Sequence, residues 1–178
     1  RAGRGGGGVG ADGLGARGVV AGREGERTAR THLLRRVRRG GEGWWVDTGC
    51  GSLTPTVPGR VQETAAQDTP HERYRLQRLD DGDYLLAASS GDDWRSLYRF
   101  DLTSPAAADN EVGNWYVCTH PHSSFPGELR ASLTWPKGRR TIGSGNYTEY
   151  RPGHAPEKRA LRDVADVRQV LQERFGVR

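Results

Sequence analysis

The sequence reads THLL at residues 31–34 and WWVDTGCG at residues 44–51, with the glycine-rich segment RGGEG between them. Apolar residues on both sides of such a segment predict a β-hairpin, with one strand over His32–Val37 and the other over Trp44–Asp47. The hairpin would bring His32 and Asp47 onto neighbouring strands. A carboxylate that accepts a hydrogen bond from an imidazole fixes the ring tautomer and suits the ring to take a proton from a thiol.

We therefore expect the side chains of His32 and Asp47 to lie within hydrogen-bonding reach, at roughly 2.6–3.2 Å. This pair would be two thirds of a Cys-His-Asp acyl-transfer triad. The chain has two cysteines, Cys50 and Cys118, and no cysteine precedes His32. We expect the nucleophilic cysteine to be absent from this chain. The chain begins with arginine and contains no methionine, which favours a fragment, a processed form or a truncated reading frame.

The two cysteines and five histidines show no clustered spacing, so the sequence predicts neither a disulfide framework nor a metal site. Cys118, within Trp-Tyr-Val-Cys, is interpreted as a small buried residue. The net charge of +5 comes mainly from arginine, densest in RRVRR at residues 35–39. We interpret this run as a solvated strand edge and expect no nucleic-acid partner. No apolar run reaches membrane-spanning length and no signal peptide is evident, which predicts a soluble, cytoplasmic protein with no membrane partner.

The first half of the chain has the pattern of an antiparallel β structure. Residues 1–13 are mostly glycine and are expected to be disordered. A weak strand signal lies at residues 19–21, and the prolines of residues 51–70 predict a long surface connection. Three further strands are expected, at residues 73–79, 84–88 and 94–100, separated by Asp/Gly turns. This spacing is typical of an antiparallel barrel or meander.

The second half mixes helices with short strands. A short helix is expected over residues 106–119, followed by two or three strands between residues 129 and 150. The last helix has the clearest pattern, with Asp163 as its N-cap and Gly176 as its stop. Its apolar residues fall on one face, which should cover a sheet; they are Val164, Val167, Val170, Leu171 and Phe175.

Block after block, the motifs resemble the arylamine N-acetyltransferase family. The blocks are THLL, WWVDTGCGSLTP, RYRL, WRSLYRFDL and NWYVCTHPHSSF, and their order and register agree with the family from about Leu14 onward. The resemblance implies an α+β fold, with an antiparallel β-barrel and a C-terminal α/β lid. This is a cysteine-protease-like acetyltransferase fold that lacks most of its N-terminal helical part. The implied boundaries are a disordered segment at 1–13, a barrel domain with the His-Asp pair at 14–125, and a lid with the C-terminal helix at 126–178.

The family resemblance also implies a reaction. An acetyl group would pass from acetyl-CoA, as co-substrate, to a cysteine and then to an arylamine, an arylhydrazine or an N-hydroxyarylamine, as in xenobiotic metabolism. His32 matches the family's base and Asp47 its orienting acid. The family's cysteine lies in an Arg-Gly-Gly-x-Cys motif, but the similar run at residues 4–6 is followed by Gly8 where the cysteine should stand. We expect the chain to be inactive alone.

The resemblance further implies a substrate and cofactor cleft beside the pair. Thr31, Gly49, Cys50 and Gly51 match family positions there, where small residues would let the substrate approach. Cys50 stands where the family usually has phenylalanine, so we interpret it as a smaller cleft wall rather than a substitute nucleophile. Two alternatives stay open. One is an amide synthase of polyketide release, which uses the same triad, and the other is a non-catalytic CoA-binding relic.

Overall fold

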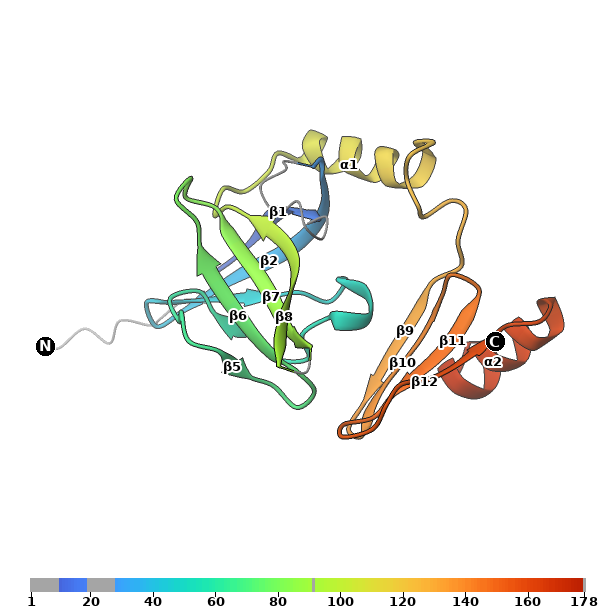
Figure 1. The fold of residues 1–178 in the computed structure, drawn as a ribbon. Helices are drawn as coiled ribbons and strands as arrows, with labels where there is room; N and C mark the ends of the chain where they lie inside the picture. The colour runs from blue at the N-terminus through green and yellow to red at the C-terminus, as the bar shows by residue number, and fades with distance from the viewer. Residues whose placement is uncertain (1–9, 19–27, 91, 178) are drawn as a thin grey trace, which may run out of the picture. The chain divides into compact units, whose positions relative to one another are not determined.

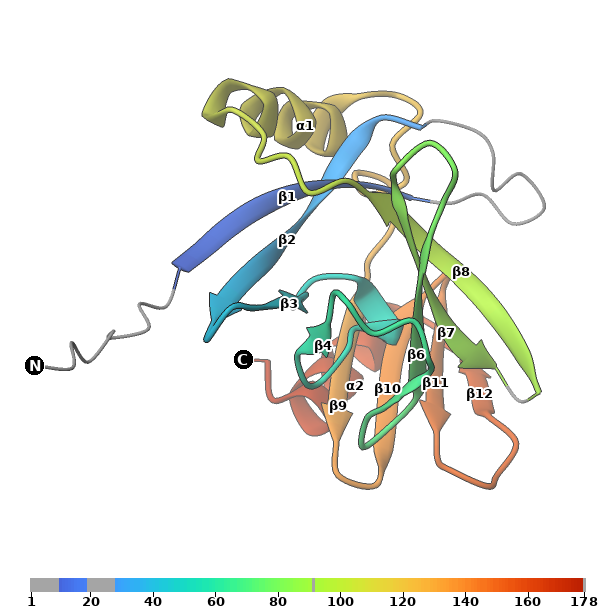
Figure 2. The same cartoon turned by 90° about the vertical axis from the view of Figure 1, so that its left-hand side faces the viewer.

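The computed structural model describes residues 10–18, 28–90 and 92–177. The chain divides into two compact units, residues 1–116 and residues 117–178. Each unit has its own sheet, shown in Figures 1 and 2. The expected α+β fold is confirmed, with an antiparallel barrel sheet and a C-terminal α/β part. Within the described residues, no helix is both long enough and apolar enough to cross a membrane.

The first unit is built on an eight-stranded antiparallel sheet with the order β4-β3-β2-β1-β8-β7-β6-β5. The sheet curls until its two edge strands are linked by one side chain. The amide of Gln67 accepts from the Arg60 backbone N–H at 2.7 Å and donates to the Arg60 carbonyl at 3.0 Å. The sheet is therefore a nearly closed barrel. Its strands are β1 (Gly10–Gly18), β2 (Arg30–Arg39), β3 (Glu42–Val46), β4 (Gly59–Arg60), β5 (Gln67–Asp68), β6 (Arg73–Arg78), β7 (Tyr84–Ser90) and β8 (Asp93–Phe100).

The barrel core comes from alternate residues of these strands. Because successive side chains of a strand point to opposite faces, a period of two places one set inside. The core cluster of the barrel consists of apolar and aromatic side chains, and burying a leucine or phenylalanine side chain contributes about 1.5–3 kcal/mol. The buried set includes Leu14, Leu34, Trp45, Tyr74, Leu76, Leu86, Tyr98 and Phe100.

The predicted hairpin is present as β2 and β3. Their register pairs Arg39 with Glu42 around Gly40 and Gly41, whose φ angles of 61° and 85° suit a tight hairpin turn that favours glycine. The strands expected at 73–79, 84–88 and 94–100 are also confirmed as β6, β7 and β8. The connection over residues 51–70 contains the short 3-10 helix η1 (Gly51–Leu53) and the two edge strands β4 and β5.

The prediction of disorder over residues 1–13 is wrong for residues 10–13, which belong to β1. Residues 1–9 and the strand signal at 19–21 lie outside the described residues. β1 pairs with β2 from Gly10 to Arg17, and Asp12 accepts a hydrogen bond from Arg36 at 2.9 Å. Glycine has a low strand propensity, but pairing with a long neighbouring strand outweighs that local cost. Arg36, within the arginine run of β2, thus provides a hydrogen-bond donor for Asp12 of β1.

Helix α1 (Ala107–Thr119) follows the barrel and has no buried residue. It approaches β2 closely at Gly113, where a Cβ would lie 2.9 Å from the carbonyl oxygen of Arg30. The expected helix is confirmed, but the prediction that Cys118 is buried is wrong. Cys118 is exposed, because α1 turns no side chain into a core.

The second unit is a four-stranded antiparallel sheet with the order β12-β11-β10-β9, covered by helix α2 (Val164–Phe175). Its small core joins Ile142, Tyr147 and Val170. Both predicted caps are confirmed. The side chain of Asp163 accepts from the Asp166 N–H at 2.8 Å, and Gly176 takes the left-handed conformation at φ 69°. Beyond the strands expected, residues 157–160 also form one; the strands are β9 (Ala131–Trp135), β10 (Gly138–Gly143), β11 (Asn146–Tyr150) and β12 (Glu157–Ala160).

Candidate active site

The His-Asp pair predicted from the sequence is present in the barrel. His32 lies on β2, and Asp47 follows directly after β3. The imidazole Nε2 is 2.8 Å from the carboxylate oxygen Oδ2, within the expected range. The imidazole side chain is 24% exposed and that of Asp47 is 0% exposed. The carboxylate is therefore held inside the protein, while the ring keeps an edge toward solvent.

Asp47 is fixed by a second hydrogen bond. Its oxygen Oδ1 accepts from the Gly49 backbone N–H at 2.8 Å. Burial alone would raise the pKa of the Asp47 carboxyl, but the hydrogen bond and charge of His32, together with the Gly49 N–H and the Tyr98 hydroxyl, hold that pKa below its usual value. Asp47 is therefore an anion at neutral pH, and it can accept from two donors at once.

The carboxylate also defines which ring nitrogen of His32 is available. An ionised carboxylate only accepts hydrogen bonds, so Nε2 must carry the hydrogen that it shares with Asp47. In the neutral ring this leaves Nδ1 as the acceptor. The Tyr98 ring packs against the imidazole with a centroid distance of 5.2 Å and an interplanar angle of 51°. The ring is thus oriented by both a hydrogen bond and packing.

The register of the hairpin explains why a residue without a side chain suits position 49. Extending the β2–β3 pairing beyond Arg35 and Val46 brings residue 49 opposite His32. A Cβ at Gly49 would lie 3.6 Å from Cε1 of His32 and 4.0 Å from Oδ1 of Asp47. A longer side chain would therefore meet both members of the pair. The structure places Gly49 beside the pair, and its assignment to a substrate cleft stays a prediction.

The other predicted cleft residues lie at different places. Thr31 precedes His32 on β2, and its Cα faces Gly113 of α1. Gly51 begins η1 with a φ of 76°, and open space surrounds the position of a Cβ there. Cys50 is half-buried and packs against the barrel core. The assignment of Thr31, Cys50 and Gly51 to a substrate cleft remains a prediction.

The environment of Cys50 disfavours the thiolate form of its side chain. Burial raises the pKa of the Cys50 thiol to about 12, and the negative charge of Asp47 adds to this effect while Arg95 partly offsets it. The thiolate is the nucleophilic form of cysteine, so a thiol that stays protonated at neutral pH reacts slowly. Among the residues that the structure describes, no group of three or more His, Cys, Asp or Glu side chains could hold a metal ion.

The sequence interpretation missed two tyrosines beside the pair. Tyr98 packs against the His32 ring, and the buried Tyr74 donates from its hydroxyl to the Leu53 carbonyl at 3.1 Å. Burial raises the pKa of both tyrosine hydroxyls. The alternation of apolar and polar residues in β6 and β8 predicts only that Tyr74 and Tyr98 face the core. The sequence signal that could have identified them is a tyrosine at a core position, because a buried phenol needs a polar partner.

The chain is similar in sequence to known acetyltransferases. A sequence model of the N-acetyltransferase family matches residues 8–178. The chain is 38% identical over 149 residues to the arylamine N-acetyltransferase of Escherichia coli, covering 83% of this chain and 53% of the relative. It is 36% identical over 149 residues to the Salmonella typhimurium protein named arylamine N-acetyltransferase / N-hydroxyarylamine O-acetyltransferase, with the same coverage. The chain thus spans about half the length of these curated relatives.

Solved structures resemble the fold over nearly the whole chain. The arylamine N-acetyltransferase of Mycobacterium tuberculosis superimposes with a TM-score of 0.88 at 34% identity, covering 96% of this chain and 64% of that protein. The Mycobacterium marinum enzyme, solved in complex with CoA, gives a TM-score of 0.87 at 34% identity and covers 95% and 63%. With the family model, the sequence relatives and the fold in agreement, this chain belongs to the arylamine N-acetyltransferase family.

Proposed function

We propose that this chain supplies the base and the orienting carboxylate for acetyl transfer from acetyl-CoA to an arylamine, an arylhydrazine or an N-hydroxyarylamine. The observation that carries the proposal is the 2.8 Å contact between Nε2 of His32 and the buried carboxylate of Asp47. That contact leaves Nδ1 as the proton acceptor. The CoA complex of the M. marinum relative supports the donor, and the name of the S. typhimurium relative supports an arylamine or an N-hydroxyarylamine as acceptor.

In the proposed first half-reaction, Nδ1 of His32 accepts the proton of a cysteine thiol. The thiolate sulfur forms a bond to the acetyl carbonyl carbon, and the bond from that carbon to the CoA sulfur breaks. The CoA thiolate takes the proton from the imidazolium and leaves as a free thiol. Asp47 stabilises the imidazolium through the Nε2–H hydrogen bond and keeps its own charge throughout.

The second half-reaction reverses these roles. The acceptor nitrogen, or the hydroxyl oxygen of an N-hydroxyarylamine, attacks the thioester carbon and passes its proton to Nδ1 of His32. The carbon–sulfur bond breaks, and the cysteine sulfur recovers that proton from the ring. Thr31, Gly49, Cys50 and Gly51 are proposed to line the cleft in which both acyl donor and acceptor approach. No metal takes part in the scheme.

We infer that the thiol of this scheme is neither of the chain's own cysteines. The Cys50 thiol has a pKa of about 12 and is half-buried. In the family that this chain resembles the cysteine precedes the histidine, whereas Cys118 follows His32 and lies near the end of α1. The reaction therefore needs a thiol that residues 1–178 do not supply. A cytoplasmic location and a role in xenobiotic metabolism remain predictions that accompany this function.

Two measurements on the purified chain test the proposal. The first is intact mass after incubation with acetyl-CoA, for the wild-type chain and Cys50→Ala. We expect no acetyl group on either. A hydroxylamine-sensitive acetyl group that disappears in Cys50→Ala would overturn the inference about the thiol and make Cys50 the nucleophile.

The second measurement replaces the missing thiol with a small soluble one. Acetylation of an arylamine by acetyl-CoA is followed with that thiol present, for wild type, His32→Gln and the control His71→Gln. His71 lies outside the site and bonds to Thr56. General-base catalysis typically contributes about 10²–10⁴-fold. We therefore expect the wild-type chain and the His71→Gln control to accelerate acetylation of the arylamine, and His32→Gln to give no acceleration. Binding of CoA without any acceleration would overturn the catalytic proposal in favour of a CoA-binding relic.

A further inference from the structure

Strand β9 is an open edge of the second unit. Among the residues that the structure describes, β9 pairs with β10 alone, while the opposite edge of the sheet is β12. The five residues of β9 are Ala-Ser-Leu-Thr-Trp, with neither a charge nor a proline. Natural edge strands are usually protected from pairing with another chain by charged residues or proline. β9 lacks both of these protections.

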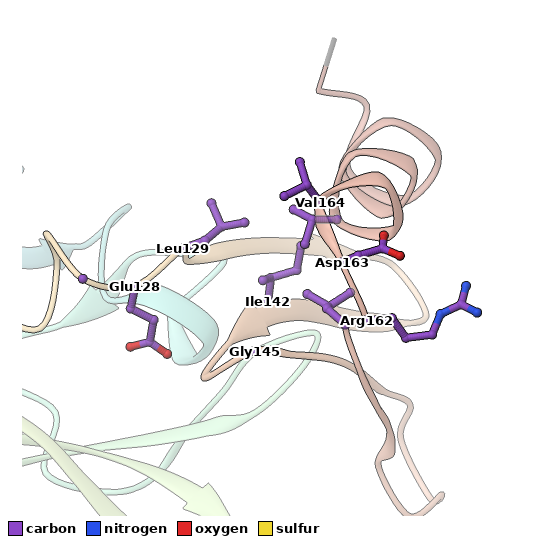
Figure 3. Close-up of a pocket in the computed structure, with 10 residues that line it drawn as sticks. Glu128, Leu129, Ile142, Gly145, Arg162, Asp163 and Val164 are labelled. Atoms are coloured by element: carbon purple, nitrogen blue, oxygen red, sulfur yellow. The ribbon is translucent and has the colours of Figure 1, made fainter.

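Exposed apolar side chains extend from β9 toward helix α2. Leu133 is 40% exposed and pairs with Arg140, whose guanidinium donates to the Arg174 carbonyl of α2. Leu133 therefore lies on the face of the sheet that α2 covers. Leu129 and Val164, 48% and 68% exposed, flank a cavity of about 450 Å³ between the sheet and α2 (Figure 3). An open backbone edge and an apolar surface thus occur together.

We propose that β9 is an interface at which a second copy of this chain adds its own β9 in antiparallel pairing, about a two-fold axis at Leu133. Such an axis creates an isologous contact, in which each residue meets a fixed partner on the other copy. It sets Leu133 opposite Leu133, Ser132 opposite Thr134, and Ala131 opposite Trp135. Every pair is compatible, because two leucines pack together, two hydroxyls can hydrogen-bond, and a small residue leaves room for an indole.

The sequence of β12 disfavours the same arrangement at the other edge. β12 reads Glu-Lys-Arg-Ala, and all four residues are exposed. In the antiparallel register that pairs all four residues of β12 with a second β12, Lys158 would lie opposite Arg159, and like charges directly opposite one another are destabilising. The contrast between an uncharged edge and a charged one therefore favours β9 as the self-pairing strand.

The cavity beside β9 takes no part in the proposed contact. Glu128, Arg162 and Asp163 share its lining with apolar residues (Figure 3). The indole of Trp135 is already packed against Arg140, whose guanidinium carbon lies 4.2 Å from the ring centroid. The proposed interface therefore consists of the paired β9 strands and the side chains that they set opposite one another. This inference does not depend on the proposed acetyl transfer.

Sedimentation velocity over a concentration series tests the interface directly. The 19.6 kDa chain should reach twice that mass, and Leu133→Lys should weaken association at least tenfold by placing two ammonium groups opposite each other. The matched control is Ala160→Lys, which adds the same charge to the exposed β12 edge and should leave association unchanged. A wild-type chain that stays monomeric, or a Leu133→Lys variant that associates as wild type does, would overturn the proposal.

Disulfide trapping tests the register, and it does not require a weakened variant to fold. In a Cys118→Ser background, Leu133→Cys should form a covalent dimer under mild oxidation, because residue 133 faces itself across the axis. Lys158→Cys on β12 is the control and should remain monomeric. Equal crosslinking at both edges would contradict the assignment. Head-to-tail pairing of β9 with β12 would instead give large assemblies, which substitutions at either edge would disrupt. That outcome would also overturn the proposal.

Discussion

Replacing Asp47 by asparagine separates the orientation of His32 from the stability of the barrel. In the wild-type chain, one carboxylate accepts from both Nε2 of His32 and the N–H of Gly49, each at 2.8 Å. An amide has one oxygen and one NH₂ group, so it can accept from only one of these donors without conflict. The Gly49 N–H cannot change its role. The amide oxygen must therefore face Gly49, and the NH₂ group must face the imidazole.

The imidazole can satisfy that NH₂ group only by changing its tautomer. Nε2 becomes the acceptor and the hydrogen moves to Nδ1, the nitrogen proposed to take the thiol proton. A hydrogen bond to a charged group contributes about 1.5–3 kcal/mol and one between neutral groups about 0.5–1.5 kcal/mol, so the two bonds together lose about 2–3 kcal/mol. Asp47→Ala should cost more, because it leaves two buried donors without an acceptor. A triad histidine in the wrong tautomer typically loses on the order of 10⁴ in rate.

The assay is nitrogen NMR of the chain labelled in its imidazole rings, recorded at alkaline pH, together with urea unfolding. The wild-type spectrum should show His32 with its hydrogen on Nε2, and Asp47→Asn should show it on Nδ1. The unfolding free energy should fall in the order wild type, Asp47→Asn, Asp47→Ala. The reasoning is refuted if Asp47→Asn keeps the wild-type tautomer, or if Asp47→Ala is as stable as wild type.

Two further predictions concern packing and acid stability. Gly59→Ala should lower the free energy of unfolding in urea by about 1–3 kcal/mol, because its Cβ would clash with the indole of the buried Trp45. The control is Gly127→Ala, where the Cβ would enter open space, and it should change that free energy by less than about 0.5 kcal/mol. Arg159 hydrogen-bonds both carboxylate oxygens of Asp166 and holds the pKa of that carboxyl well below its usual value. The pair should therefore stabilise the second unit above about pH 4 and lose that contribution as the pH falls below it. Acid unfolding followed by circular dichroism should lose this pH dependence in Asp166→Asn, and an unchanged acid limb would contradict it.

Local signals explain which elements were predictable. The β2–β3 hairpin follows from glycines at its turn, and the limits of α2 follow from Asp163 and Gly176. In each case a few neighbouring residues determine the backbone, so the sequence suffices. The strands β1 and β12 depend instead on pairing with other strands, β1 with β2 and the distant β8, and β12 with β11. The glycines of β1 argue against a strand, but pairing with β2 on one side and with β8 on the other makes that strand form.

The residues of the site also differ in whether the sequence predicts their positions. The contact between His32 and Asp47 was predictable because both residues lie in one hairpin, and the register also brings Gly49 opposite the ring. Tyr98 comes from β8, which meets β1 and β7 but not the hairpin strands themselves. Its approach to His32 depends on how the whole sheet curls, and no spacing in the sequence encodes that curvature. Long-range closure of the barrel therefore completes a site that the hairpin begins.

The charge of Asp47 has opposite effects on the two groups beside it. It fixes the His32 ring through Nε2 and leaves Nδ1 ready to receive a proton. It also disfavours ionisation of the Cys50 thiol, whose pKa burial has already raised. A thiol at position 50 is thus suppressed by the group that prepares the base. The proposed nucleophile must therefore approach His32 at Nδ1, the ring nitrogen that Asp47 leaves as an acceptor.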